Sequence, residues 1–132
     1  MGEIRGILKS STEGYDPIYN PQEDSLILTY QQGNEILGYV ELEAMSHYLF
    51  VRALIVDRAH QCGMIGWRLL EAVSQLAGWL NKVGYYGQVR ANDNRMLKLA
   101  ERFPGIREYS PSEKDDKYRY FHVERTNHVH PS

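Results

Sequence analysis

Residues 54–70, LIVDRAHQCGMIGWRLL, place two glycines and several polar side chains between two apolar segments. An apolar run stops at Asp57, and helical spacing begins at Ile65. A turn that enters a helix leaves backbone N–H groups without partners, and the helix dipole adds partial positive charge there. Glycine lets the backbone approach a ligand closely. The stretch therefore predicts an anion site suited to phosphate or pyrophosphate. Three basic or titratable side chains flank it: Arg58, His60 and Arg68.

The same glycines also have a purely structural interpretation. Gly63 and Gly66 can serve only to make a tight turn and to let the helix pack closely on a sheet. The stretch is not a Walker A loop, because it lacks Gly-Lys-Ser/Thr, and it is not a complete GxGxxG motif. From the residues alone, both interpretations stay open.

Other titratable residues could take part in acid–base chemistry. Glu41 and Glu43 alternate onto one face of a predicted strand, which makes them candidate general bases or part of a solvated face. His47 titrates near neutrality but also fits a turn, and Arg52 could pair with either glutamate or bind an acidic acceptor. Cys62 has no His/Asp arrangement around it, so we expect no nucleophilic role.

Hydrophobic periodicity predicts the elements that must position these residues. Alternating or continuous apolar runs predict strands at 4–8, 25–30, 35–44, 48–56 and 85–91, and two more within 105–109 and 117–125. Three- and four-residue apolar spacing predicts helices at 64–83 and 92–103, the second capped by Asp93 or Asn94. The order predicts an α/β fold, a single mixed β-sheet flanked by helices. We expect one domain over 1–126 and a flexible tail over 127–132, where His128 and His130 lack further metal ligands.

Composition excludes several classes of protein. The 132 residues are 42% apolar and 24% charged, with a net charge of −2, so nucleic acid is an unlikely general partner. The short stretch KYRYFHVER has the aromatic and basic character of a nucleic-acid surface, but the overall charge does not support that function. No apolar run approaches the roughly 20 residues of a membrane span, so no membrane partner is expected. A single cysteine favours a reducing, cytoplasmic setting.

Two motifs in the correct order resemble those of the GNAT family, the Gcn5-related N-acetyltransferases. In QCGMIGWRLL, Gln61 and Gly66 match the ends of the family's Arg/Gln-x-x-Gly-x-Gly/Ala loop, and Leu69-Leu70 match its helical pair. In NRMLKLAERFPGI, Asn94 and Gly105-Ile106 match the family's Asn-led helix. The resemblance covers about residues 35 to 123. It implies a GNAT-like fold that uses acetyl-CoA as co-substrate and no metal.

The resemblance also implies roles for individual residues. The loop amides would hold the coenzyme A pyrophosphate; they belong to Gln61, Cys62, Gly63, Met64, Ile65 and Gly66. Backbone groups of Leu54, Ile55 and Val56, where the central strand splays from 86–90, would polarise the thioester, and Asn94 would bind the pantetheine arm.

Three departures from the family pattern affect these expectations. Met64 stands where the loop usually has its middle glycine, and Glu101 stands where the family often has the tyrosine that acts as general acid. Lys98 is the expected partner of Glu101. Among Tyr85, Tyr86 and Tyr109, which could supply another phenol, Tyr86 is our candidate. The N-terminal region that shapes the acceptor site is short, as in small acetyltransferase-like proteins of bacteriophages.

These observations predict an acetyl-CoA-dependent N-acetyltransferase that moves an acetyl group to an amine. The short acceptor region suits a protein or another large acceptor, whose identity the sequence does not specify, and a homodimer is compatible with it. The alternative is a catalytically degenerate GNAT-like interaction or structural protein of the virion type. The expected location is the cytoplasm of the cell or of an infected host.

Overall fold

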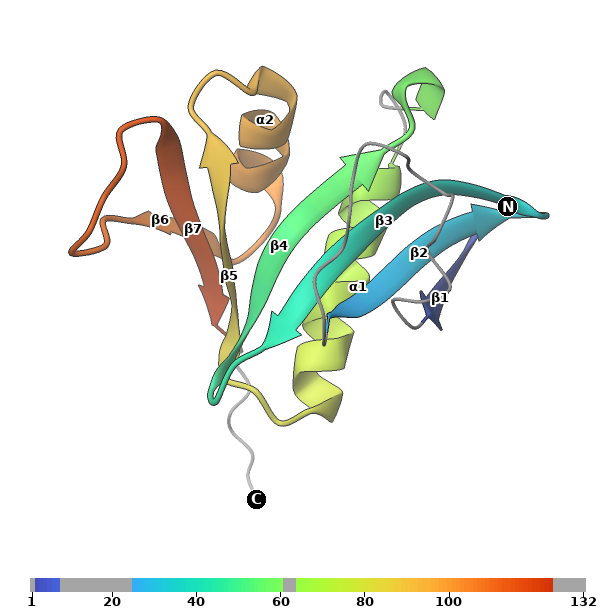
Figure 1. Ribbon diagram of the computed structural model, residues 1–132, viewed down its shortest axis with the longest axis horizontal. Coiled ribbons are helices and arrows are strands. Elements are labelled where there is room, and N and C mark those ends of the chain that lie inside the picture. Colours follow the sequence, from blue (N-terminus) through green and yellow to red (C-terminus); the bar gives the residue numbers. More distant parts are fainter. Residues whose placement is uncertain (1, 8–24, 61–63, 125–132) are drawn as a thin grey trace.

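The computed structural model describes residues 2–7, 25–60 and 64–124 of the chain. Within these residues, seven strands form one mixed sheet in the order β1-β2-β3-β4-β5-β7-β6 (Figure 1). The strands are β1 Glu3–Ile7, β2 Leu26–Gln32, β3 Glu35–Ala44, β4 Tyr48–Val56, β5 Gly84–Arg90, β6 Ile106–Tyr109 and β7 Tyr118–Glu124. The helices are α1 Ile65–Trp79 and α2 Asn94–Arg102, with a short 3₁₀ turn at Arg58–His60. The predicted sheet flanked by helices is confirmed.

The connections explain why the sheet is mixed. β2, β3 and β4 form an antiparallel meander, in which Gly33 takes a positive φ of 63° in the β2–β3 turn. The helix α1 then carries the chain back, so that β5 pairs with β4 in parallel. β7 pairs antiparallel with β5, and β6 lies outside β7.

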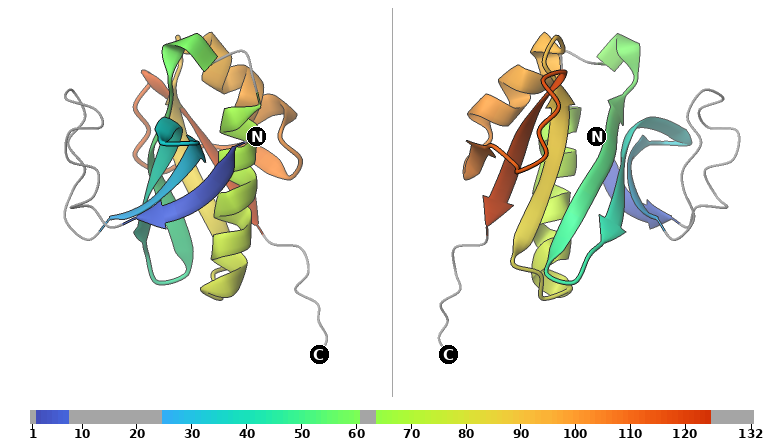
Figure 2. Two further views of the ribbon diagram at one scale, coloured as in Figure 1. Left: turned by 90° about the vertical axis from the view of Figure 1, so that its right-hand side faces the viewer. Right: turned by 60° about the vertical axis from the view of Figure 1, so that its left-hand side comes forward.

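Both helices lie on the same face of the sheet (Figure 2). Leu69, Val73 and Ala77 of α1 are buried against β3 and β4, where Val40, Leu42 and Leu49 have no exposed surface. Leu97 and Ala100 of α2 pack on Phe121 of β7. Apolar burial on this face is the main stabilising contribution to the fold.

The helix predicted at 64–83 ends earlier, at Trp79. Asn81 takes a left-handed backbone conformation with φ of 58°, which stops the helix. The N–H groups of Lys82 and Asn81 donate to the carbonyl oxygens of Ala77 and Gly78, at 2.8 and 3.1 Å. These two bonds form a Schellman motif around Asn81, which terminates the helix.

Two of the predicted segments lie outside the described residues: the irregular stretch 10–24, with its short acceptor region, and the tail 127–132. No helix in the described part of the chain is long and apolar enough to span a membrane.

Candidate functional site

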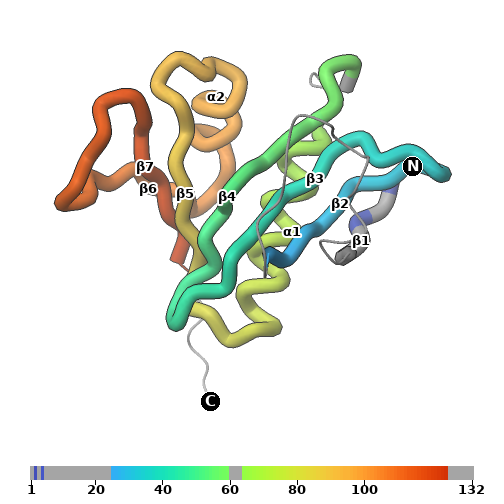
Figure 3. Tube along the Cα trace, in the orientation of Figure 1, coloured from blue at the N-terminus to red at the C-terminus, as the bar shows by residue number. Residues whose placement is uncertain are grey.

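The central feature of the site is the separation of β4 from β5. The two strands pair only from Tyr48 opposite Gly84 to Val51 opposite Gly87. Beyond that point they diverge, as Figure 3 shows, and the predicted splay is confirmed. On its other edge β4 stays paired with β3, with a bulge that leaves Arg52 as the extra residue. Bulges often occur beside active sites, where they redirect a side chain.

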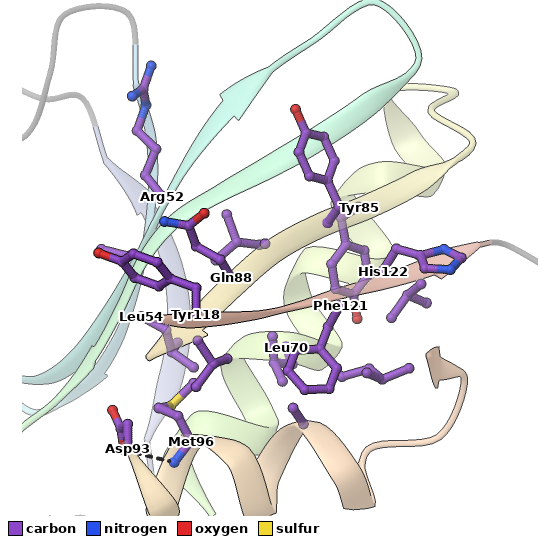
Figure 4. A pocket seen from close by; sticks show the side chains of 18 of the residues that line it. Arg52, Leu54, Leu70, Tyr85, Gln88, Asp93, Met96, Tyr118, Phe121 and His122 are labelled. Carbon is purple, nitrogen blue, oxygen red and sulfur yellow. Dashed lines mark hydrogen bonds between the residues drawn. The ribbon is translucent and has the colours of Figure 1, made fainter. Parts of the chain in front are cut away.

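A cavity of 360 Å³ occupies the splay between β4 and β5 (Figure 4). It is lined from the helix-covered face of the sheet by Leu70, Ala100 and Phe121, and from the opposite face by Arg52, Tyr86 and His122. Because both faces contribute, the cavity passes between the strands. Such an opening can hold an extended, mainly apolar chain with a reactive group at its end.

A second cavity of 530 Å³ lies where the end of β4 meets the N-terminus of α1 and the outer surface of α2. Its cationic side chains come from α2, namely Arg95, Lys98 and Arg102. Four residues line both cavities: Leu54, Ile55, Asp93 and Met96. The two cavities therefore adjoin, one with a cationic rim and one that enters the sheet.

The N-terminus of α1 opens onto the second cavity through Met64 and Gly66. No side chain of the described residues caps this helix end. A Cβ on Gly66 would lie 3.0 Å from Leu99 Cδ2 and 4.0 Å from the Leu54 and Val56 side chains. Gly66 thus fits both interpretations of the motif, since it lines the cavity and also lets α1 approach α2. The remaining loop candidates, Gln61, Cys62 and Gly63, lie outside the described residues.

The structure brings several of the other predicted site residues together. Leu54 and Ile55 line both cavities, Val56 lines the second and Tyr86 lines the first. Ile65 is instead buried in the core. Asn94 is exposed at the first turn of α2 and lines neither cavity.

Asp93, next to Asn94, occupies the position between the two cavities. Its Oδ1 accepts a hydrogen bond from the Met96 N–H at 3.1 Å, which caps α2. The sequence favoured Asp93 or Asn94 as the cap, and the structure selects Asp93. As a consequence, Asp93 is oriented by the helix beside both cavities (Figure 4).

The two glutamates predicted on β3 occupy different environments. Glu41 is fully buried and accepts a hydrogen bond from the Ser25 hydroxyl. Glu43 is partly exposed and forms an ion pair with Arg52, which resolves the pairing that the sequence left open. Neither glutamate lines the cavity in the splay, whereas Arg52 does.

Arg52 lines the cavity and is paired with Glu43. The Arg52 Nη2 donates to Glu43 Oε1, while the Arg52 Nε is buried and has no hydrogen-bond partner among the described residues. The uncapped N-terminus of α1 and the cationic side chains of α2 make the second cavity suitable for an anionic group.

Sequence reasoning missed a cluster of aromatic and titratable side chains on the face of the sheet opposite the helices. Phe50, Tyr86 and His122 lie side by side on β4, β5 and β7. The Tyr86 ring lies 5.1 Å from that of Phe50, and the Tyr109 ring meets His122 edge to face at 5.2 Å. The period-two alternation of YRYFHVE could have identified this face, because it places Tyr118, Tyr120 and His122 on one side.

Tyr85 and Tyr109, the alternatives to Tyr86, differ in their environment. The Tyr85 hydroxyl shares a 2.9 Å hydrogen bond with Ser74 of α1, and burial raises the pKa of Tyr85 to about 12. Tyr109 lies on β6, where burial and the nearby phenols of Tyr86 and Tyr120 raise its pKa. Tyr86 alone of the three both lines the cavity and faces away from the helices.

Glu101, which stands at the position of the family's tyrosine, belongs to a surface ion-pair network. Its partner is Arg119, at 3.4 Å, and not Lys98 as expected. Arg119 also binds Glu108 at 2.7 Å, and this hydrogen bond holds the pKa of Glu108 below its usual value. Glu101 is exposed and lines neither cavity. Among the described residues, no group of three or more His, Cys, Asp or Glu side chains could hold a metal ion.

Several solved structures share this fold. The structure is similar to the IAA acetyltransferase of Bacillus cereus ATCC 14579, with a TM-score of 0.79 and 16% identity over 95% of this chain and 100% of that one. It is also similar to a GNAT family acetyltransferase of Elizabethkingia anophelis with acetyl-CoA bound (TM-score 0.76, 15% identity, 94% and 98% covered). A third similar structure is the ribosomal-protein-S18-alanine N-acetyltransferase of Escherichia coli (TM-score 0.73, 14% identity, 98% and 99% covered).

At these identities the structural similarities establish the fold, and the family rests on sequence. Among curated proteins, none matches this sequence significantly. The model of the acetyltransferase (GNAT) family matches residues 6–105, which is most of the chain. The chain therefore belongs to the GNAT acetyltransferase family.

Proposed function

We propose that this protein is an N-acetyltransferase that moves the acetyl group of acetyl-CoA to an amine. The observation that carries the proposal is the pair of adjoining cavities, one at the N-terminus of α1 and one in the splay between β4 and β5. The proposal is supported by the family and by a similar structure that contains acetyl-CoA.

The anionic part of acetyl-CoA fits the second cavity. The N–H groups at the start of α1, near Met64 and Gly66, would donate to the pyrophosphate. Arg95, Lys98 and Arg102 of α2 add positive charge on the opposite wall. Met64 is 61% exposed and lines this cavity, so the anion would lie beside its side chain.

The pantetheine arm and the thioester fit the cavity in the splay. Over Arg52–Ile55 the edge of β4 has left its ladder with β5, so backbone groups there face the cavity. A backbone N–H of Leu54 or Ile55 would polarise the thioester carbonyl as negative charge develops. Tyr86, at the closed end of the splay, would donate a proton to the departing sulfur.

Titration of the protein with acetyl-CoA in a calorimeter tests this proposal. We expect micromolar binding by the wild type and binding about tenfold weaker or more for Gly66→Val, a loss of about 1.4 kcal/mol. The valine side chain would meet Leu99 and enter the cavity wall at the start of α1. Absence of binding by the wild type would contradict the proposal.

Gly78→Val is the matched control for this experiment. Gly78 lies in the same helix, and a Cβ there meets nothing within 4 Å. Both variants carry the same cost of valine in a helix, but only one touches the cavity. Equal loss of binding in the two variants would mean that helix stability, and not the shape of the cavity, explains the effect.

The alternative function is a GNAT-like protein that binds partners without catalysis. The observation that favours it is Glu101, which replaces the family's tyrosine and is held by Arg119 away from both cavities. The same titration separates the two functions, because an interaction protein with a degenerate site has no need to bind acetyl-CoA. A protein acceptor is consistent with the proposed transferase, as the name of the similar Escherichia coli enzyme indicates for that enzyme.

A further inference from the structure

We propose that His122 is the general base of this transferase, the group that takes the proton from the acceptor amine. The inference rests on the proposed function, since it assigns a role within the same site. The first observation is the position of His122 in the sheet. His122 lies directly opposite Tyr86, which in turn lies opposite Phe50 on β4. The next residues of β4 and β5, Val51 and Gly87, are the last pair before the strands separate.

His122 therefore lies at the closed end of the splay, on the face opposite the helices. It lines the cavity together with Tyr86 and Arg52, while its neighbour Phe121 points toward α2 (Figure 4). An acceptor cannot approach from the helix-covered face, because the core fills it. An amine that reaches the thioester must come over the face on which His122 is partly exposed.

The other titratable groups that line this cavity are poorly suited to accept a proton. The guanidinium groups of Arg52 and Arg90 have no acceptor atom, and a phenol such as Tyr118 offers a weakly basic oxygen. The Asp93 carboxylate already accepts the Met96 N–H as the cap of α2. His122 is left as the lining side chain whose ring nitrogen can accept a proton.

The Glu124 carboxylate lies beside the imidazole. Its Oε2 is 3.8 Å from His122 Nδ1, which is within ion-pair reach of a protonated imidazole but longer than a hydrogen bond. The Tyr48 hydroxyl donates to the same carboxylate oxygen at 3.1 Å. Glu124 therefore offers a negative charge that would stabilise the imidazolium formed when His122 takes the proton.

The remaining charged and titratable groups around His122 come from two strands. On β6, Tyr109 packs edge to face against the imidazole and Arg107 lies directly across the ladder. On β7 itself, Tyr120 precedes it on the same face and contacts Tyr109. Arg107 thus brings a positive charge and Glu124 a negative charge to the surroundings of His122.

The chemical step is balanced in protons and electrons. The lone pair of the amine attacks the thioester carbonyl carbon, the C–N bond forms, and the C–S bond breaks with its electron pair going to sulfur. One proton passes from the amine nitrogen to His122. One proton passes from Tyr86 to the sulfur, and exchange with solvent restores both side chains.

The test compares wild type with His122→Gln in two measurements. Calorimetry with acetyl-CoA should give the same affinity for both proteins, because His122 lies at the acceptor side of the cavity. Release of coenzyme A from acetyl-CoA, followed with a thiol-reactive dye and 2-phenylethylamine as the probe amine, should be about 100-fold slower in the variant. The wild-type and variant rates are compared at each pH, because the free fraction of the probe amine itself rises with pH in both assays.

His47→Gln is the matched control, because His47 is exposed in the β3–β4 turn and lines neither cavity. We expect it to keep the wild-type rate and pH profile. His122→Asn provides a second variant, and thermal melting of all three shows that each is folded. The proposal would be overturned if the rates of wild type and of both His122 variants agreed within about twofold, whether those rates are high or low. Absence of acetyl-CoA binding by wild type would instead overturn the proposed function beneath it.

Discussion

Two adjacent rows of side chains cross β4, β5 and β7 and face opposite sides of the same sheet. The core row consists of Leu49, Tyr85 and Val123, and the site row consists of Phe50, Tyr86 and His122. The core row packs under α1, where Leu49 has no exposed surface and the Tyr85 hydroxyl is bonded to Ser74. The site row is half-buried and faces away from both helices; Tyr86 and His122 line the cavity from that side, as Tyr85 and Val123 do from the core side.

The difference shows how a chain of 132 residues can place stability and chemistry in the same three strands. Because the strand has a period of two, one step along the backbone moves a side chain from the core to the site. The core row fixes the spacing of β4 and β5 up to Val51 and Gly87, and the splay begins there. The site row therefore lies at the closed end of the splay, and the core row stabilises that part of the sheet.

The strongest way to break this comparison is to truncate the most buried member of the core row. Leu49→Ala deletes a fully buried side chain that packs in the main core. We expect the free energy of unfolding in urea to fall by about 2–5 kcal/mol. Leu26→Ala, at a 37% exposed position of β2, should cost less than about 1 kcal/mol. Equal losses in the two variants would contradict the assignment of Leu49 to the core.

The comparison is sharpened by removing one hydroxyl from the site row. Tyr86→Phe keeps the ring that stacks on Phe50 and removes the proposed proton donor to sulfur. Turnover of acetyl-CoA should fall about 100-fold. Acetyl-CoA affinity and the melting temperature should stay near the wild-type values. If turnover changes less than about twofold, the sulfur receives its proton from solvent or from another group.

The strands were predictable because local signals mark their ends. The apolar segments at 35–44 and 48–56 coincide with β3 and β4, since turn residues such as Gly33 and Ser46 flank them. The end of α1 was not predictable from periodicity, because Leu80 and Val83 continue the apolar spacing beyond Trp79. A left-handed Asn81 ended the helix, and such a conformation follows from local hydrogen bonds that periodicity does not encode.

The candidate site was predictable only where the motif coincides with a strand end. Leu54 and Ile55 were found because the family resemblance places a splay at the end of the central strand. The proposed role of His122 was missed because it depends on register. Only the pairing of β7 with β5 places His122 opposite Tyr86, 36 residues earlier in the chain.

The smallest expected effect concerns Tyr85, the core-row neighbour of Tyr86. Tyr85→Phe removes the hydrogen bond to Ser74 and should cost about 1 kcal/mol of stability at neutral pH, with turnover retained. Burial raises the pKa of Tyr85 from 10.0 to about 12, so above pH 10 the unfolded wild type loses this proton before the folded protein does. Its contribution to stability is complete below pH 10 and is lost as pH rises toward 12. Urea unfolding should therefore show the gap between wild type and variant narrowing over that range. A constant gap would mean that Tyr85 ionises equally in both states, and the two rows would then differ less in burial than their positions indicate.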